Sequence, residues 1–387
     1  MTASSITVSG FSTSTPARVA VVHDYFTQRG GAERVAAHMA RVFEAPVFTS
    51  VFDHSALPPT LTPSGVRATF LQPVRELGVP LTPMAPLLPS AFARLDLRGF
   101  DVIISSTSAF AHHVRRRNGS VHVSYCHTPP HFLWERDEYF RGREMRERLL
   151  RPALERLRRQ DVAAARRVDR YLANSEYTAA RIQDAYGIPA RVVYPPVDTS
   201  ALMPSSERSG RFLVVSRLRR HKRIDLAIAA ATLLAEPLDI IGDGPDLPRL
   251  RKLAGPTVRF LGPRSDDEVR HAMARCIALV VPATGDFGLT LVEAQASGRP
   301  PIAHAAGGAL EIIRDGETGF LFDGPSVRSL AAAMVRARTS ALDPAALLAS
   351  AGRFDAATFD RALVDAIEEA VAERHPRRLA RLEPRWA

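Results

Sequence analysis

The sequence predicts an α/β protein of two domains, each with a parallel sheet. Three observations support this prediction. Short, continuously apolar segments recur along the 387 residues, as expected for strands that are buried on both faces of a parallel sheet. Helical patterns separate these segments, which indicates repeated strand–helix–strand units. The chain is too long for one hydrophobic core, and it suits two domains of about 150–200 residues each.

The first domain is predicted over residues 18–204, after a flexible N-terminal tail over residues 1–17. It begins with an apolar strand, which is followed by Gly30 and Gly31 and then by a helix. A strand that leads through glycines into a helix is typical of the start of an α/β layer. The predicted elements are strands at 18–23, 102–105, 121–125, 171–173 and 191–194 and a helix at 32–43.

The second domain is predicted over residues 211–374, after a polar linker at 205–210 and before a basic C-terminal tail at 375–387. Its strands are predicted at 212–216, 238–241, 258–261, 277–281 and 301–304, and its helices at 224–234, 246–253, 266–274 and 289–297. Ligands of such sheets bind at the carboxyl ends of the strands. Two facing sheets therefore predict a cleft between the domains with the active site inside it.

Several classes of function are excluded by what the sequence lacks. It has no apolar segment of about 18 residues, which predicts that no helix spans a membrane. The N-terminus has no secretion signal and there are only two cysteines, so we expect a cytoplasmic protein. The sequence contains no Asp-x-Asp pair and no phosphate-binding loop of the Walker type, so we expect no metal ion at the site. No zinc-finger or RNA-binding motif indicates nucleic acid as a partner.

Positive charge is concentrated between Arg141 and Arg170. The net charge of the chain is +10, and this segment holds 11 arginines against 5 acidic residues. Its leucine spacing predicts an amphipathic helix with a basic outer face. Two interpretations stay open: an ordinary solvated helix face, or a surface that docks on an anionic membrane from the cytoplasmic side.

Two loops of the second domain are suited to a diphosphate. One follows a strand and carries Arg217 and Lys222. Arginine supplies a bidentate fork and lysine a compact charge, both of which suit phosphate oxygens. The other contains Gly285 and Gly288 and leads into the helix that carries Glu293. Backbone N–H groups at such a helix start attract anions. A glycine pair at 307–308 again precedes a helix.

Longer motifs around these residues resemble the retaining glycosyltransferases of family 4, which have the GT-B fold of two facing Rossmann-like domains. The second domain carries Val215-Ser-Arg-Leu-Arg-Arg-His-Lys222, Asp286-Phe-Gly-Leu-Thr-Leu-Val-Glu-Ala-Gln-Ala-Ser-Gly298 and Asp315-Gly-Glu-Thr-Gly-Phe-Leu321. The first carries His23-Asp-Tyr-Phe-Thr-Gln-Arg-Gly-Gly-Ala-Glu-Arg34, Tyr125-Cys-His-Thr-Pro129 and Tyr194-Pro-Pro-Val-Asp198, which are similar to the mannosyltransferase branch. The resemblance runs from about Arg18 to Glu373.

The resemblance implies a role for each matching residue. Arg217 and Lys222 would bind the diphosphate of a nucleotide-sugar donor and, with His127 beside the donor sugar, would form the catalytic set. Glu293 would bind the ribose. The remaining donor-binding residues would be Gly30, Gly31, Asp286, Phe287, Gly288 and Leu289. The expected donor is GDP-mannose or a UDP-sugar, no other cofactor is expected, and the acceptor is unknown, with a lipid-linked acceptor as one candidate.

One residue departs from the family pattern. The family usually has two glutamates eight positions apart, and the first of them falls here on Gly285. This departure keeps one alternative open, a catalytically silent sugar-nucleotide-binding protein. A GT-B sugar-nucleotide epimerase stays open as a second alternative. The epimerase would need a pair of acidic residues around the sugar, and we find no such pair in the sequence.

Overall fold

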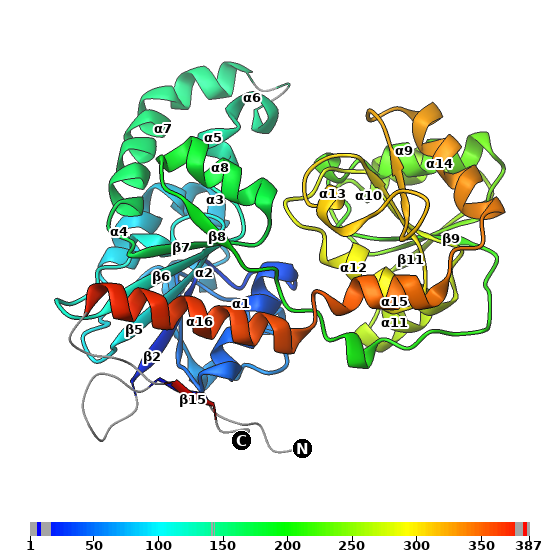
Figure 1. Ribbon diagram of the computed structural model, residues 1–387. Helices are drawn as coiled ribbons and strands as arrows, with labels where there is room; N and C mark the ends of the chain where they lie inside the picture. The colour runs from blue at the N-terminus through cyan, green and yellow to red at the C-terminus, as the bar shows by residue number, and fades with distance from the viewer. Residues whose placement is uncertain (1–5, 9–16, 141, 143, 376–381, 385–387) are drawn as a thin grey trace. The chain divides into compact units, whose positions relative to one another are not determined.

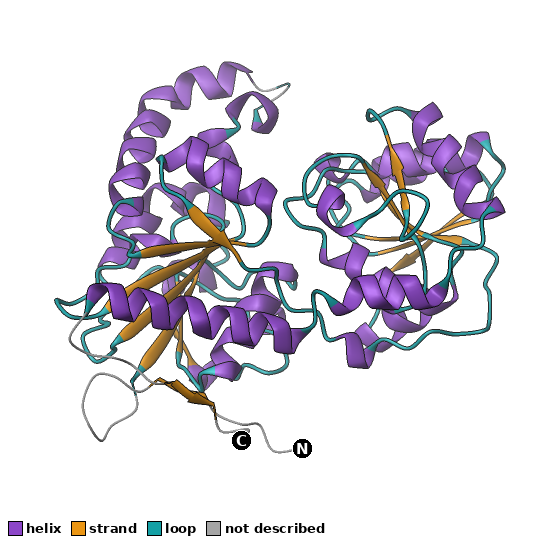
Figure 2. Ribbon diagram, viewed as in Figure 1, coloured by secondary structure: helices purple, strands orange, loops and turns teal. Residues whose placement is uncertain are grey.

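The structure is a computed structural model that describes residues 6–8, 17–140, 142, 144–375 and 382–384 (Figure 1). The chain divides into two compact units. Unit 1 comprises Met1–Tyr194 and Phe359–Ala387, and unit 2 comprises Pro195–Thr358. Each unit contains one parallel sheet with helices packed against it (Figure 2). The prediction of two α/β domains with Rossmann-like sheets is confirmed.

The sheet of unit 1 has seven parallel strands in the order β4-β3-β2-β5-β6-β7-β8. The strands are β2 (Val19–His23), β3 (Val47–Thr49), β4 (Val66–Ala68), β5 (Val102–Thr107), β6 (Val121–Cys126), β7 (Arg170–Ala173) and β8 (Ala190–Val192). Successive residues of β2 face opposite sides. Val19 and Val21 join one apolar cluster, whereas Ala20 and Val22 join another. This alternation explains the continuously apolar sequence of the strand.

Most helices of unit 1 lie in the connections between its strands. They are α1 (Gly31–Val42), α2 (Gln72–Glu76), α3 (Leu81–Met84), α4 (Leu88–Ala93), α5 (His131–Trp134), α6 (Arg136–Tyr139), α7 (Glu144–Ala165) and α8 (Glu176–Tyr186). The predicted basic helix is α7, and Arg141 and Arg143 lie outside the described residues. Among the described helices, none is long and apolar enough to cross a membrane.

The last long helix, α16 (Ala356–Arg374), corrects the predicted domain boundaries. The sequence assigned it to the second domain, but from Phe359 onward it belongs to unit 1. Its apolar face is the reason: Phe359, Leu363 and Ile367 are buried in the same cluster as Val21 of β2. An amphipathic helix packs where it can bury its apolar face, whatever its place in the sequence.

The other boundary also lies earlier than predicted. Residues 195–204 belong to unit 2, because a short extended segment pairs with the loop before α16. The Val197 N–H donates to the Phe354 carbonyl at 3.0 Å, and the Thr199 hydroxyl donates to Asp355 at 2.6 Å. The stiff Tyr194-Pro-Pro segment, and not the polar segment 205–210, therefore marks the transition between units.

The sheet of unit 2 has six parallel strands in the order β11-β10-β9-β12-β13-β14. They are β9 (Phe212–Val215), β10 (Leu238–Ile241), β11 (Val258–Gly262), β12 (Leu279–Val281), β13 (Pro301–His304) and β14 (Phe320–Phe322). The helices are α9 (Ile224–Leu233), α10 (Leu247–Leu253), α11 (Asp266–Arg275), α12 (Leu289–Ala296), α13 (Ala309–Ile312), α14 (Val327–Thr339) and α15 (Pro344–Gly352). The Ser265 side chain and Glu268 form a capping box at the start of α11.

The two predicted tails are described only in part. Within them, β1 (Ile6–Val8) and β15 (Leu382–Pro384) pair as a two-stranded antiparallel sheet. The rest of the predicted flexible N-terminal tail and of the basic C-terminal tail, apart from residue 17 and residue 375, lies outside the described residues.

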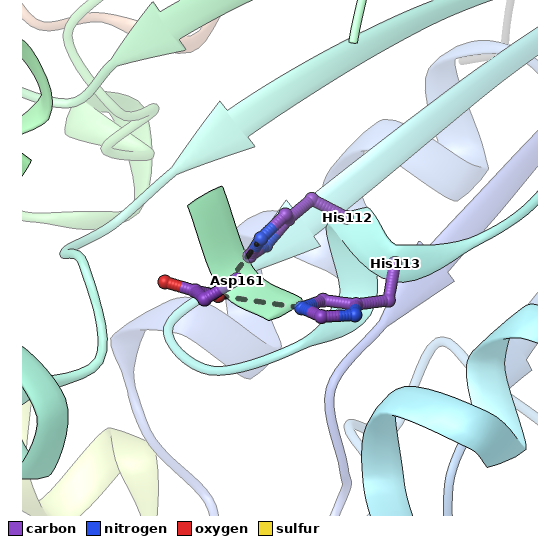
Figure 3. Close-up of side chains that lie close together, drawn as sticks. All are labelled: His112, His113 and Asp161. Atoms are coloured by element: carbon purple, nitrogen blue, oxygen red, sulfur yellow. Dashed lines mark hydrogen bonds and ion pairs between the residues drawn. The ribbon is translucent and has the colours of Figure 1, made fainter. Parts of the chain in front are cut away.

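A buried carboxylate joins several elements of unit 1. Asp161 of α7 accepts hydrogen bonds from Trp134 Nε1 at 2.9 Å and from the Tyr186 hydroxyl at 2.8 Å. Figure 3 shows its contacts with two histidines: His113 Nε2 lies 3.3 Å from the carboxylate and His112 Nε2 lies 3.0 Å from it. Burial alone would raise the pKa of Asp161, but the two histidines hold that pKa below its ordinary range. Through this charge, α7 is joined to α5, to α8 and to the turn after β5.

We expect the stability of the protein to fall as the pH falls below about 6.5. The ordinary pKa of a histidine is 6.5. Mainly through burial, the pKa falls to about 3 for His23 and His122 and to about 4 for His113. Between these values the unfolded chain binds protons that the native rings do not. Each ring therefore lowers the free energy of unfolding by up to about 1.4 kcal/mol per pH unit.

Urea unfolding at pH 7.5, 6.0 and 5.0 measures this slope. The variant His122→Asn removes one of the three rings and should flatten the slope by about a third. A free energy of unfolding that does not change over this range would contradict the prediction.

Candidate functional site

The order of the strands in unit 2 defines where a ligand can bind. The chain leaves β9 toward β10 on one side of the sheet and returns to β12 on the other, so β9 and β12 flank the point where the strand order reverses. In open α/β sheets the crevice for ligands lies at this point, outside the carboxyl ends of the strands. The loop with Arg217 and Lys222 follows β9, and the loop with Asp286 follows β12. The two predicted donor loops, 64 residues apart at Lys222 and Asp286, therefore leave adjacent strands.

The first loop is anchored by its apolar residue. Leu218 is buried, and its N–H and C=O bond to Asp243 O at 2.8 Å and Asp246 N at 3.0 Å. On either side of Leu218, Arg217 and Arg219 are exposed. The loop ends in a 3₁₀ turn that contains Lys222, and Arg223 has a left-handed conformation, with φ of 49°, before α9. The backbone is thus fixed while its cationic side chains stay at the carboxyl edge.

Three charges of the two loops act on one another. Burial lowers the pKa of Lys222, the positive charge of Arg217 lowers it further, and Asp286 opposes both effects. Two cations held near each other at a partly desolvated position repel, and an anion between them relieves this repulsion. The arrangement of Arg217 and Lys222 can therefore bind a diphosphate.

The second loop is held by a third, glycine-rich loop. Gly285 pairs with Gly307, and the Gly308 N–H donates to the Gly285 carbonyl at 3.1 Å. Phe287 is buried, and its ring lies 5.4 Å from that of Phe354. At Gly308 an added Cβ would lie only 2.3 Å from the Phe287 carbonyl oxygen. The glycine pair at 307–308 therefore serves the close approach of two loop backbones.

Helix α12 begins directly after this second loop. Gly288 precedes it with φ of 108°, and Leu289 is its first residue. Glu293 lies in the second turn, half-buried between the buried residues Val292 and Ala294. A carboxylate at this place is neither in the core nor fully exposed, so it can accept hydrogen bonds from a ligand at the end of the sheet.

In unit 1 the predicted residues lie at the carboxyl edge of the sheet. Gly30 and Gly31 form the start of α1, and an added Cβ at Gly30 would lie 2.5 Å from Glu33 Oε2. His127 directly follows β6 and is buried; its Nε2 lies 2.8 Å from the Ser106 hydroxyl oxygen. Its carbonyl accepts from Asn174 Nδ2 at 3.0 Å. Both the ring and the backbone of His127 are thus held in place.

Sequence reasoning missed the polar residues that support this edge. Ser106 lies at the end of β5 and contacts both His127 and His23. Asp24, which the sequence analysis named only within a motif, accepts hydrogen bonds from the four backbone N–H groups of residues 108–111. A signal was present, because the apolar strand 102–104 ends in the polar residues Ser-Ser-Thr at 105–107.

Two open parallel sheets, each with candidate ligand loops at its carboxyl edge, define a two-domain α/β protein with Rossmann-like sheets. Comparison with known families gives the particular family. Residues 29–201 match the family described as Glycosyltransferase Family 4, and residues 203–346 match that described as Glycosyl transferases group 1. Together these matches cover both halves of the chain. The chain belongs to the family 4 glycosyltransferases of the GT-B fold.

Individual relatives are consistent with this family. The D-inositol 3-phosphate glycosyltransferase of Mycolicibacterium vanbaalenii is 31% identical over 273 residues, which are 59% of this chain and 60% of that protein. The GDP-mannose-dependent alpha-(1-6)-phosphatidylinositol monomannoside mannosyltransferase of Mycobacterium tuberculosis is 32% identical over 211 residues, 46% of this chain and 54% of that protein. The chain thus matches little more than half of the length of these relatives.

Solved structures show the same fold. The Anabaena protein HepE in complex with UDP and glucose has a TM-score of 0.70 at 21% identity, with 91% of this chain and 99% of HepE covered. Sucrose-phosphate synthase of Thermosynechococcus elongatus has a TM-score of 0.71 at 17% identity, with 92% and 100% covered.

We expect Gly308→Ala to lower the free energy of unfolding by about 1–3 kcal/mol, because the new methyl group overpacks the backbone of Phe287. Gly285→Ala is the matched control in the facing loop. The nearest atom to a Cβ there is 4.0 Å away, so its effect should stay within about 0.5 kcal/mol. Chemical unfolding of both variants gives the comparison, and equal effects would mean that the loops do not pack as described.

Proposed function

We propose that this chain is a retaining, metal-independent glycosyltransferase that transfers a sugar, with mannose favoured, from a nucleoside-diphosphate sugar to an acceptor hydroxyl. The product would be a glycan, a glycolipid or a polysaccharide. One observation carries the proposal: two loops distant in sequence bring Arg217, Lys222 and Asp286 within electrostatic range at the switch point of the unit 2 sheet. A pair of cations at that position suits the phosphate groups of a nucleotide sugar.

The chemistry follows from charge. When the bond between the anomeric carbon and the diphosphate oxygen breaks, negative charge develops on the leaving diphosphate. The loop backbone that carries Arg217 and Lys222 is already held by hydrogen bonds, so these two cations would stabilise that charge with little reorganisation. Two cationic side chains can do what a metal ion does in other transferases, so the proposed reaction needs none. In the proposed front-face mechanism, the leaving phosphate accepts the proton of the acceptor hydroxyl.

The other residues would bind the rest of the donor. Glu293 would accept hydrogen bonds from the ribose hydroxyls, while residues 286–289 and the glycines at 30–31 would line the donor with backbone. His127 would contact the donor sugar. GDP-mannose is favoured because the relative from Mycobacterium tuberculosis is a GDP-mannose-dependent enzyme. A UDP-sugar is the second choice, since the structural neighbour HepE was crystallised with UDP and glucose.

The test is a transfer and hydrolysis assay with GDP-mannose, UDP-glucose and other nucleotide sugars, in the presence and absence of excess EDTA. The proposal expects the release of nucleoside diphosphate from one donor, unaffected by EDTA, with retained configuration in the product. A complete loss of activity in EDTA that Mn²⁺ restores would overturn metal independence.

Gly285 favours a second candidate, a silent sugar-nucleotide-binding protein. Nothing lies within less than 4.0 Å of a Cβ at this position, and its φ is not in the left-handed region. Space at the Cβ position therefore does not impose glycine here. If donors bind but none is hydrolysed or transferred, and if Gly285→Glu creates activity, the silent protein is the better description.

We expect Arg217→Ala and Lys222→Ala each to weaken the binding of the matching nucleoside diphosphate by about 1.5–3 kcal/mol, because each removes a charge-assisted contact. Arg219→Ala is the matched control, since this arginine is exposed in the same loop. Isothermal titration calorimetry measures the affinities. If the affinity is unchanged in both variants, this loop does not bind the diphosphate of the donor.

We also propose that α7 docks unit 1 on the anionic cytoplasmic face of a membrane, where a lipid-linked acceptor would be presented. Met145 and Leu149, one helical turn apart, are 69% and 78% exposed. Arg148, Arg156 and Arg159 of the same helix are exposed as well. Exposed apolar side chains among arginines are typical of helices that lie in a membrane interface.

Each arginine near an anionic surface contributes about 1 kcal/mol, and salt screens this attraction over a Debye length of about 10 Å at 0.1 M. We therefore expect salt-sensitive co-sedimentation with anionic vesicles and its loss on changing Arg148, Arg156 and Arg159 to Gln. The control variant changes three exposed arginines of unit 2, Arg251, Arg264 and Arg328. Equal loss in both variants would indicate attraction by net charge alone.

A further inference from the structure

Two buried histidines and one serine form a connected chain at the carboxyl edge of the unit 1 sheet. His23 ends β2, Ser106 lies near the end of β5, and His127 directly follows β6. The strand order reverses between β2 and β5, so this chain lies at the switch point, where open α/β sheets bind ligands. The Ser106 hydroxyl oxygen is 3.0 Å from His23 Nδ1 and 2.8 Å from His127 Nε2.

The positions of the protons follow from the second contact of His23. Its Nδ1 also lies 3.2 Å from the Ser106 carbonyl oxygen, which can only accept. Nδ1 of His23 therefore carries a proton and shares it between the carbonyl and the hydroxyl oxygen of Ser106. Burial, reinforced by the neighbouring His127, lowers the pKa of His23 to about 3, so this ring is neutral.

The serine hydroxyl must then donate in the other direction. Among the described residues, the Ser106 hydroxyl contacts two ring nitrogens, His23 Nδ1 and His127 Nε2. His23 Nδ1 already donates to it, so His127 Nε2 is the one that can accept its proton. A ring nitrogen that accepts an O–H hydrogen bond has no proton of its own, and in a neutral imidazole the proton is then on the other nitrogen.

We propose that Ser106 is a positioning residue that holds His127 in the tautomer with its proton on Nδ1. This inference rests on the proposed function only for its consequence in catalysis. Because Ser106 engages Nε2, any hydrogen bond from this ring to the donor sugar would be donated by Nδ1. Under the proposed function, His127 would then act as a donor to a sugar oxygen and not as the base that removes a proton.

The protein offers a matched control in the adjacent residue. Ser105, one position earlier on β5, is also buried, and its hydroxyl oxygen lies 2.8 Å from Nε2 of the buried His122 on β6. Ser105→Ala and Ser106→Ala therefore each remove one hydroxyl group from β5. The first breaks a hydrogen bond to His122 of β6, and the second breaks one to His127, which directly follows β6. Only Ser106 contacts the ring that the proposed function uses.

The first experiment reads the tautomer without activity. In protein labelled with ¹⁵N-histidine, the ring nitrogens of His127, assigned by their loss in His127→Gln, should show a protonated Nδ1 and an unprotonated Nε2. Ser106→Ala should change this pattern, whereas Ser105→Ala should leave it intact. A proton on Nε2 of His127 in the unaltered protein would overturn the proposal, whether or not the chain is a glycosyltransferase.

The second experiment measures turnover with the donor found active. Ser106→Ala should lower kcat about tenfold, the size of one lost hydrogen bond, with the KM for the donor changed less than twofold. Ser106→Thr keeps the hydroxyl and should restore most of kcat, and Ser105→Ala should leave it within twofold. Equal losses in the two alanine variants, or no rescue by threonine, would overturn the positioning role. If no donor is turned over, the proposed function fails while the tautomer result stands.

Discussion

The structure depends on one constraint of parallel sheets: all strands of a sheet end at the same edge. Every loop that follows a strand is then brought to that edge, however far apart the loops are in sequence. In unit 2 this places the loops after β9 and β12 next to each other. In unit 1 it places His23, Ser106 and His127 in contact. The candidate site residues of both units lie at these carboxyl edges, where the loops that follow the strands meet.

Much of the fold could be predicted from the sequence, because a strand that is buried on both faces must be continuously apolar. The strands at Leu238–Ile241 and Pro301–His304 begin and end as predicted. The three-residue strands β3, β4 and β14 were missed, whereas the equally short strands β8 and β12 overlap the longer strands predicted at 191–194 and 277–281. The placement of α16 was also missed, because an apolar helix face does not say which sheet it covers.

The charged residues of the candidate site could be predicted from the sequence, whereas the polar residues that support the site could not. Arg217 and Lys222 stand out because phosphate recognition requires cations in a loop. Ser106 does not stand out, since a serine at the end of a buried strand has a meaning only when its neighbours across the sheet are known. The parallel register pairs Ser106 with His23 on one side and with Tyr125, two residues before His127, on the other. Such contacts between strands are set by the register, which the sequence alone does not reveal.

The identity of Lys222 is itself informative. Only two of the 51 basic residues counted as Lys or Arg are lysines, and the other, Lys252, is exposed on α10. Lys222 is instead partly buried, and the charges of Arg217 and Asp286 both act on it. A guanidinium has a broad planar fork that would need several acceptors at this position, whereas an ammonium is compact and acts as a point charge. Of the two lysines in the chain, the partly buried one thus stands where a compact ammonium suits a position beside a second cation.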